Sequence, residues 1–339
     1  MPSLRVQVEA VNDCLVEVRS KKAPPCLDPE LPTLFPTQAN LYRFIAVQAA
    51  DELEEELSRD DPLRASWFAS CRLKYAGAWL AAIPSLSCFR VRSQLFRVML
   101  CLRLLVEVPG TASIKRCVCG YAGNQLQTGV HWLSQCGKCA FTTVRHNAVL
   151  DVLHKMLKEC GVATQRGETA NWLARNRSVR PFDMVVTIDY KRHGYDVGIA
   201  DATRLGKDRS VPYFQAGKAA DLLLKEKQRD YQKKITEYGP LIKEVQFSPV
   251  IFEAAGGFGA KAQQLFGEWQ KLALEHAKAT GRSPNYRHRG GCPHTWNAMR
   301  FTAMYTQMLS FTIVKFSAFG VLRAIERASA AALQAANSA

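Results

Sequence analysis

The stretch RPFDMVVTIDYKRHGYDVGIADATR, residues 180–204, decides how the C-terminal half of this chain is interpreted. Two apolar runs, 184–188 and 195–200, flank the charged segment DYKRHG and predict a β-hairpin. Asp183 stands directly before the first run, and Asp196 lies near the start of the second. Taken alone, this pattern favours solvated carboxylates beside a turn over metal ligands.

The register of this hairpin decides whether the two carboxylates can meet. If DYKRHG closes a tight turn, strict pairing places Asp183 opposite Ala200, with Asp196 on the same face but several residues away. A bend in the first strand would then be needed to join Asp183 and Asp196. Asp201 would be the nearer carboxylate and is kept as a reserve ligand. The acid-x-lysine sequence DYK falls in the expected turn and is interpreted as solvated.

The composition indicates a folded, basic protein. The chain has 339 residues, of which 47% are hydrophobic, so we do not expect it to be disordered over its whole length. Its formal net charge of +15 favours a polyanionic partner such as nucleic acid over an anionic membrane surface. We find neither a signal-peptide pattern nor eighteen uninterrupted apolar residues. We therefore expect no membrane partner and a nuclear or other intracellular location, not secretion.

A cluster of cysteines and a histidine predicts a zinc site. The chain has 11 cysteines, an odd number that favours reduced thiols over a disulfide scaffold. Cys117, Cys119, His131 and Cys136 form CxC, eleven residues, then H-x4-C, a spacing that allows four tetrahedral ligands. Cys139 could replace Cys136, and ordinary buried cysteines beside a surface histidine are the alternative.

The remaining periodicity indicates helices on both sides of the hairpin. Helical patterns cover residues 37–57, 66–84, 93–109, 145–161, 218–238, 262–277 and 296–335, and a strand running into a glycine-rich turn covers 248–259. In the fourth helix, Asn147 is a candidate N-cap and Gly161 a candidate stop. This order predicts an α/β or α+β domain.

We divide the chain into five segments. They are an extended arm or linker (1–36), a helical region (37–112), a zinc-binding module (113–142), the α/β domain (143–280), and a basic loop with a C-terminal helix (281–339).

The order of these features resembles the C-terminal part of the polyproteins of non-LTR retrotransposons that carry a restriction-enzyme-like endonuclease. The resemblance spans roughly residues 65–325. Its most specific pieces are the Cys/His cluster directly before RHN, and the Pro-x-Asp of RPFD followed by the Asp-Val of YDVGIAD. It implies the PD-(D/E)xK fold, a central mixed sheet flanked by helices. It also implies DNA nicking with Mg²⁺ or Mn²⁺, alongside a structural Zn²⁺.

Carried over position by position, the resemblance assigns catalytic residues. Asp183 becomes the first metal carboxylate and Asp196 the second. Lys227, one helical turn before Tyr231, becomes the displaced catalytic lysine, because Gly198 occupies the place where a D-x-K motif would put it.

The resemblance also assigns supporting residues and leaves alternatives open. Arg145 and His146 become the basic pair at the start of the first helix of the domain, and Tyr231 a DNA-binding or supporting residue. Lys225 or Lys218 could serve instead of Lys227. Further acidic candidates are Glu168 and Glu253, each of which is better explained as a surface residue.

Two candidate functions, which belong to different classes, follow from these features. The first is a metal-dependent DNA endonuclease, with RNA as an open second partner. The second is a catalytically inactive, zinc-containing nucleic-acid-binding protein derived from the same family. The chain contains no YxDD-like polymerase motif, so it resembles a downstream piece, a free-standing derivative or a decayed copy of such an element.

Overall fold

The computed structural model describes residues 38–82, 84, 87–139, 141–167, 181–203, 216–238, 240–281 and 301–337. The chain divides into two compact units, Met1–Glu56 and Leu57–Ala339. Helix α3 (Gln38–Asp60) confirms the helix predicted over 37–57, although it is longer. The predicted arm (1–36) and the basic loop SPNYRHRGGCPH (283–294) lie outside the described residues.

The second unit begins with short helices. Helix α4 (Pro62–Arg72) starts at an N-cap, Asp61, whose side chain accepts a hydrogen bond from the backbone of Arg64. The prediction of one helix over 66–84 is wrong, because the chain turns extended at Leu73 and left-handed at Tyr75 (φ 69°). The elements η2 (Ala78–Ala81), η3 (Ser87–Phe89) and α5 (Ser93–Leu104) follow.

A mixed sheet of four strands forms the centre of the α/β part. In order across the sheet, the strands are β1 (Ala163–Arg166), β2 (Met184–Ile188), β3 (Lys191–Ala200) and β4 (Gln246–Glu253). β1, β2 and β3 pair antiparallel, whereas β3 and β4 pair parallel. Strand β1 has no counterpart in the sequence prediction. The mixed sheet flanked by helices that the sequence predicts is confirmed at this level.

The hairpin between β2 and β3 differs from the prediction. Its turn consists of Asp189 and Tyr190 alone, both with positive φ (48° and 62°), as a two-residue type I′ turn requires. Ile188 therefore pairs with Lys191, and the sequence analysis wrongly assigned the first four residues of β3 to the turn. Every residue of β2 therefore pairs with an earlier residue of β3 than the sequence analysis predicted.

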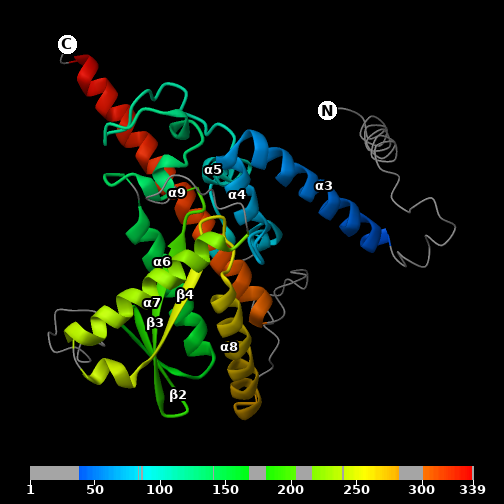
Figure 1. The fold of residues 1–339 in the computed structure, drawn as a ribbon, viewed down its shortest axis with the longest axis vertical. Helices are drawn as coiled ribbons and strands as arrows, with labels where there is room; N and C mark the ends of the chain where they lie inside the picture. Colours follow the sequence, from blue (N-terminus) through cyan, green and yellow to red (C-terminus); the bar gives the residue numbers. More distant parts are fainter. Residues whose placement is uncertain are drawn as a thin grey trace. The chain divides into compact units, whose positions relative to one another are not determined.

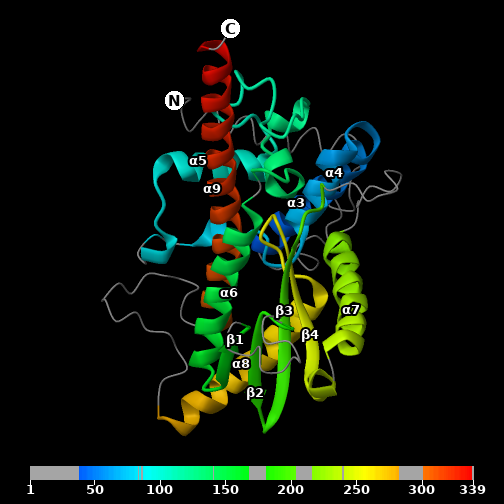
Figure 2. The ribbon, with the colours of Figure 1, turned by 90° about the vertical axis from the view of Figure 1, so that its left-hand side faces the viewer.

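Helices cover both faces of the sheet. Helices α6 (Thr142–Glu159) and α8 (Ala260–Ala279) lie on one face, and α7 (Lys218–Tyr238) lies on the other (Figures 1 and 2). On the first face, Trp269 of α8 donates a hydrogen bond to the hydroxyl of Tyr195 at 3.3 Å. Helix α6 begins at Thr142, so the prediction of Asn147 as its N-cap is wrong. Gly161, with φ 77°, ends it as predicted.

Helix α9 (Phe301–Asn337) ties the segments of the second unit together. It packs on α5, α6 and α8, and its side chains join one continuous core with those of the helical region, the Cys/His cluster and the first face of the sheet. Among the described helices, only this one is long and apolar enough to cross a membrane. Within its most apolar window 61% is buried in the protein.

Candidate active site and candidate metal centre

The register of the hairpin brings Asp183 and Asp196 face to face. The ladder ends with the pair Met184 and Tyr195, and the chain bends at Asp183, one residue before β2. The bend that the sequence analysis required is therefore present. The backbone N–H of Asp183 still donates to Tyr195 O at 3.0 Å, and the side chains of Asp183 and Asp196 hydrogen-bond to each other. The two carboxylates meet on the side covered by α7.

Asp183 is held at the point where β2 begins. Beyond this point β3 has lost its neighbour on that side, and the backbone N–H of Val197 donates instead to Asp183 Oδ2 at 2.7 Å. His146 Nε2, from the first turns of α6, lies 2.9 Å from the same oxygen. His146 thus reaches the site that the sequence assigned to it. A side chain that substitutes for a strand in this way has little freedom to rotate.

Asp196 is held by Lys227. The ammonium of Lys227, from α7, lies 3.0 Å from Asp196 Oδ2. Gly198 makes this approach possible, since a Cβ there would come within 2.7 Å of Ile251 and 2.9 Å of Leu223 on α7. The close packing that requires glycine at position 198 also leaves no room for a lysine. The lysine that contacts Asp196 therefore comes from α7 and not from β3.

The alternative lysines lie elsewhere. Lys218 and Lys225 are exposed on α7, Lys218 in its first turn and Lys225 in a groove on the flank of the helix. Lys234, which the sequence assignment missed, is the second cation near the pair. Its Nζ donates to Pro181 O at 3.2 Å, and its charge acts to lower the pKa of Asp196. Its spacing of seven residues from Lys227, two helical turns, is the signal that could have identified it.

The two carboxyl groups differ in their ease of ionisation. Burial opposes ionisation of Asp183, but hydrogen bonds from His146 and Asp196 outweigh it and lower the pKa to about 2. Burial and the hydrogen bond with Asp183 raise the pKa of Asp196 to about 6, despite the charge of Lys227. Adjacent carboxylates repel each other unless a proton or a cation lies between them. The oxygens of Asp183 and Asp196 fit a hard divalent cation, which takes one or two protein carboxylates and fills its shell with water and phosphate.

Two supporting residues are more buried than the sequence suggested. Arg145 is 3% exposed, and its Nη1 donates to Ser317 Oγ of α9 at 2.9 Å, while burial lowers its pKa to about 10. Tyr231 is 8% exposed and donates from its hydroxyl to the carbonyls of Ile242 and Val245. Burial favours a supporting role for both residues over direct contact with DNA. Both side chains hold helices in place around the site.

The reserve carboxylates lie outside the pair. Asp201 follows β3, and its Oδ1 accepts hydrogen bonds from the backbone and the hydroxyl of Thr203, at 3.0 and 2.6 Å. Glu253 was interpreted as a surface residue, but it is 1% exposed and accepts from the backbone of Ala220 in the first turn of α7. Burial raises its pKa. Glu168 lies outside the described residues.

The Cys/His cluster assembles as its spacing predicts. One ligand atom each from Cys117, Cys119, His131 and Cys136 lies within 4.8 Å of all the others. Cys117 and Cys136 Sγ are 3.6 Å apart, far beyond the S–S bond of about 2.05 Å. Thiolates about 2.3 Å from one tetrahedral zinc ion lie at roughly this separation. The four side chains can hold a structural metal such as zinc.

The surroundings of the cluster favour Cys136 over Cys139 as the fourth ligand. The backbone N–H of Cys139 donates to Cys136 Sγ at 3.2 Å, and the Trp132 indole donates to Cys117 Sγ at 3.2 Å. The ring of Tyr121 stacks on His131, with centroids 4.3 Å apart, and fixes its orientation. Such donors and packing groups around the ligands are typical of metal centres.

No protein-family model matches the chain, and no curated protein matches it.

Proposed function

We propose that the chain is a divalent-metal-dependent endodeoxyribonuclease that nicks one DNA strand, built on a PD-(D/E)xK-like sheet, as in non-LTR retrotransposon polyproteins. One observation carries the proposal: the side chains of Asp183 and Asp196 hydrogen-bond to each other, with Lys227 Nζ 3.0 Å from Asp196. Two carboxylates and a lysine on one face are the groups needed for metal-assisted hydrolysis of a phosphodiester. The sequence resemblance supports the same assignment.

The proposal gives each residue of the site a role. Asp183 and Asp196 hold Mg²⁺ or Mn²⁺, which when bound supplies Lewis-acid stabilisation of the phosphate and activation of water. Lys227 orients the attacking water or neutralises charge that develops on the phosphate. His146 holds Asp183 in a fixed rotamer through its contact at 2.9 Å. Lys234 adds positive charge at the start of β2, where its Nζ contacts Pro181 O.

The Cys/His cluster has a structural role in the proposal. Its four ligands leave no open position for a substrate, in contrast to catalytic zinc sites, which keep one. The net charge of +15 favours contacts with phosphates, so DNA affinity should fall steeply with salt.

Nicking of a supercoiled plasmid tests the proposal. We expect conversion to the open circle with Mg²⁺ or Mn²⁺ and none with EDTA. Salt-dependent DNA binding without cleavage under either metal would select the other candidate, an inactive nucleic-acid-binding protein that retains the zinc module.

A further inference from the structure

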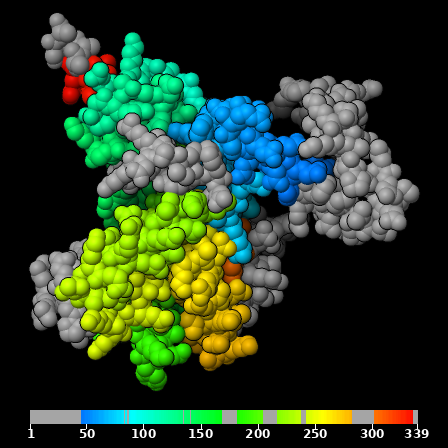
Figure 3. Space-filling view, viewed as in Figure 1, coloured from blue at the N-terminus to red at the C-terminus, as the bar shows by residue number. Residues whose placement is uncertain are grey.

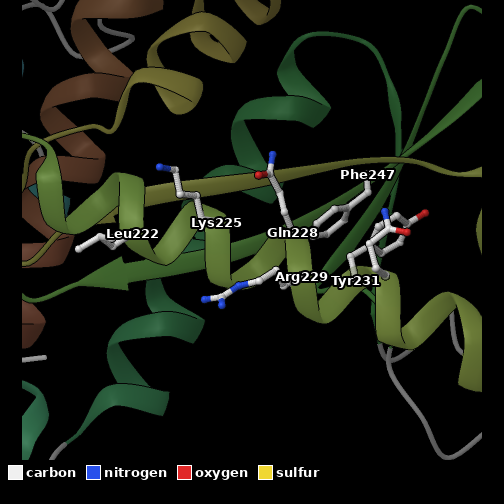
Figure 4. Close-up of a pocket in the computed structure, with 7 residues that line it drawn as sticks. Leu222, Lys225, Gln228, Arg229, Tyr231 and Phe247 are labelled. Atoms are coloured by element: carbon white, nitrogen blue, oxygen red, sulfur yellow. The ribbon is translucent and has the colours of Figure 1, made fainter. Parts of the chain in front are cut away.

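A groove runs along the outer flank of α7, away from the carboxylate pair. It has a volume of about 780 Å³ and lies between α7 and the start of β4. In the space-filling view, α7 is exposed alongside α8 (Figure 3). Lys225, Gln228 and Arg229 extend from the helix, and Tyr231 and Phe247 lie side by side near them (Figure 4). Leu222 and Gln232 complete the lining.

The side of α7 that lines the groove carries more cations than carboxylates. At 100° per residue, Lys225 and Arg229 fall on this side together with one carboxylate, Asp221, whereas Glu226 and Asp230 lie about 100° and 140° from Lys225 around the helix. Among the described residues, neither Lys225 nor Arg229 has an ion-pair partner, whereas Lys227 and Lys233 both do. Two exposed, unpaired cations one turn apart, flanked by glutamine amides, favour an anionic ligand.

The floor of the groove is aromatic and fixed. The rings of Tyr231 and Phe247 stack with centroids 4.1 Å apart and planes within 16°. The hydroxyl of Tyr231 donates to Ile242 O at 2.9 Å, so its ring cannot turn away. Tyr231 is only 8% exposed, so the partly buried Phe247 offers the accessible ring surface, which combines contact for a base with the charge above it for phosphates.

The edge of the sheet argues against an acidic peptide as the occupant. β4 is the outermost strand of the described sheet, where an extended peptide could add as a further strand. Pro249 interrupts β4 and has no N–H, which in a sheet is tolerated where that donor would face away from the neighbouring strand. The outer edge therefore lacks a donor that strand addition would use.

We propose that this groove binds a single-stranded segment of nucleic acid, with Lys225 and Arg229 on successive phosphates and Phe247, supported from behind by Tyr231, against a base. The inference rests on the proposed function only in taking nucleic acid as the partner, because it requires no cleavage. Lys227 projects from a different face of α7, so the groove can be altered without touching the carboxylate pair.

Binding of a fluorescein-labelled oligo(dT) to the full chain, measured by anisotropy over a salt series, tests the inference. The double variant Lys225→Gln/Arg229→Gln should bind about tenfold more weakly, with the slope of log K against log salt smaller by about 1.4 for two lost contacts. The matched control is Lys271→Gln/Lys278→Gln, which removes the same charge from exposed positions on α8. The control should lose less than about twofold.

Three results would overturn the inference. They are equal losses in the two double variants, an equal loss of affinity for a duplex of the same length, and competition by poly-glutamate as effective as that by oligo(dT). Failure of the proposed function is a different result: oligo(dT) is bound through the groove, but no plasmid is nicked.

Discussion

The Cys/His cluster and the carboxylate pair are two ligand sites with opposite designs. The cluster offers four ligands, three of them sulfur, and Cys117, His131 and Cys136 are all buried. The pair offers hard oxygens from two side chains, and the Asp183 side chain remains 24% exposed. Closed sets of four ligands are typical of structural metal sites, whereas incomplete sets leave room for water and substrate. The difference is the one expected if the cluster holds a structural metal and the pair has the proposed catalytic role.

The two sites also differ in how the chain builds them. All four cluster ligands lie between residues 117 and 136, so local turns suffice to bring them together. The pair and its partners come from α6, β2, β3 and α7, and meet only when the sheet and both helix layers are packed. Substitutions in the cluster should therefore lower stability, whereas substitutions in the carboxylate pair should lower activity.

Loss of the cluster should have the largest effect. Cys117→Ser should lower bound zinc from one equivalent to below about half and should destabilise the second unit strongly, because structural zinc contributes about 10 kcal/mol or more in small zinc domains. Metal analysis and thermal unfolding measure both. The control is Cys139→Ser, a buried thiol outside the four ligands. If Cys139→Ser loses zinc and Cys117→Ser does not, the ligand assignment is wrong.

Removal of the first carboxylate should abolish cleavage while leaving the fold intact. Asp183→Asn should reduce plasmid nicking on the order of 10³-fold, about 4 kcal/mol in the activation free energy, because a metal oxygen ligand is lost. The same change at Asp189, exposed in the hairpin turn, provides the control. Nicking by Asp183→Asn at the rate of the parent would remove the catalytic assignment.

Loss of the helix-borne lysine should have a somewhat smaller effect. Lys227→Met should slow nicking by about 10²-fold, with little change in DNA affinity, because the lysine acts on the reacting groups through its position. Lys233→Met, whose ammonium pairs with Asp230 on the surface of the same helix, is the matched control. Equal rates for the two variants would mean that another lysine, such as Lys234, serves the reaction.

The close contact of α7 with the sheet should be sensitive to a single methyl group. Gly198→Ala should destabilise the protein by about 1–3 kcal/mol, since its Cβ would meet Ile251 and Leu223 at under 3.0 Å. The melting temperature should fall by several degrees, and nicking should fall with it as Lys227 is displaced. Gly267→Ala on α8, where a Cβ meets nothing within 4 Å, should not destabilise. If Gly198→Ala melts like the parent, close packing does not explain the displaced lysine.

Much of the fold could be predicted from the sequence where local chemistry dominates. The helix at 218–238 agrees with α7 because its period and composition are unambiguous. The Cys/His cluster assembles because the ligand spacing and glycine-containing turns lie within one short segment. The boundaries of other helices were less certain, as Leu73 and Tyr75 show, because backbone reversals there depend on what the chain packs against.

The sequence by itself determined which residues could form the carboxylate site, but not how they meet. Asp183, Asp196, His146 and Lys227 were all named by carrying the family resemblance over position by position. Only the tertiary structure decided that Asp183 meets Asp196 and does not lie opposite Ala200, because two residues with positive φ set the turn and fix the register as far as Met184 and Tyr195, and the chain bends at Asp183. It also decided that Arg145 is buried and that the lysine comes from α7, because both depend on how closely helices pack on the sheet.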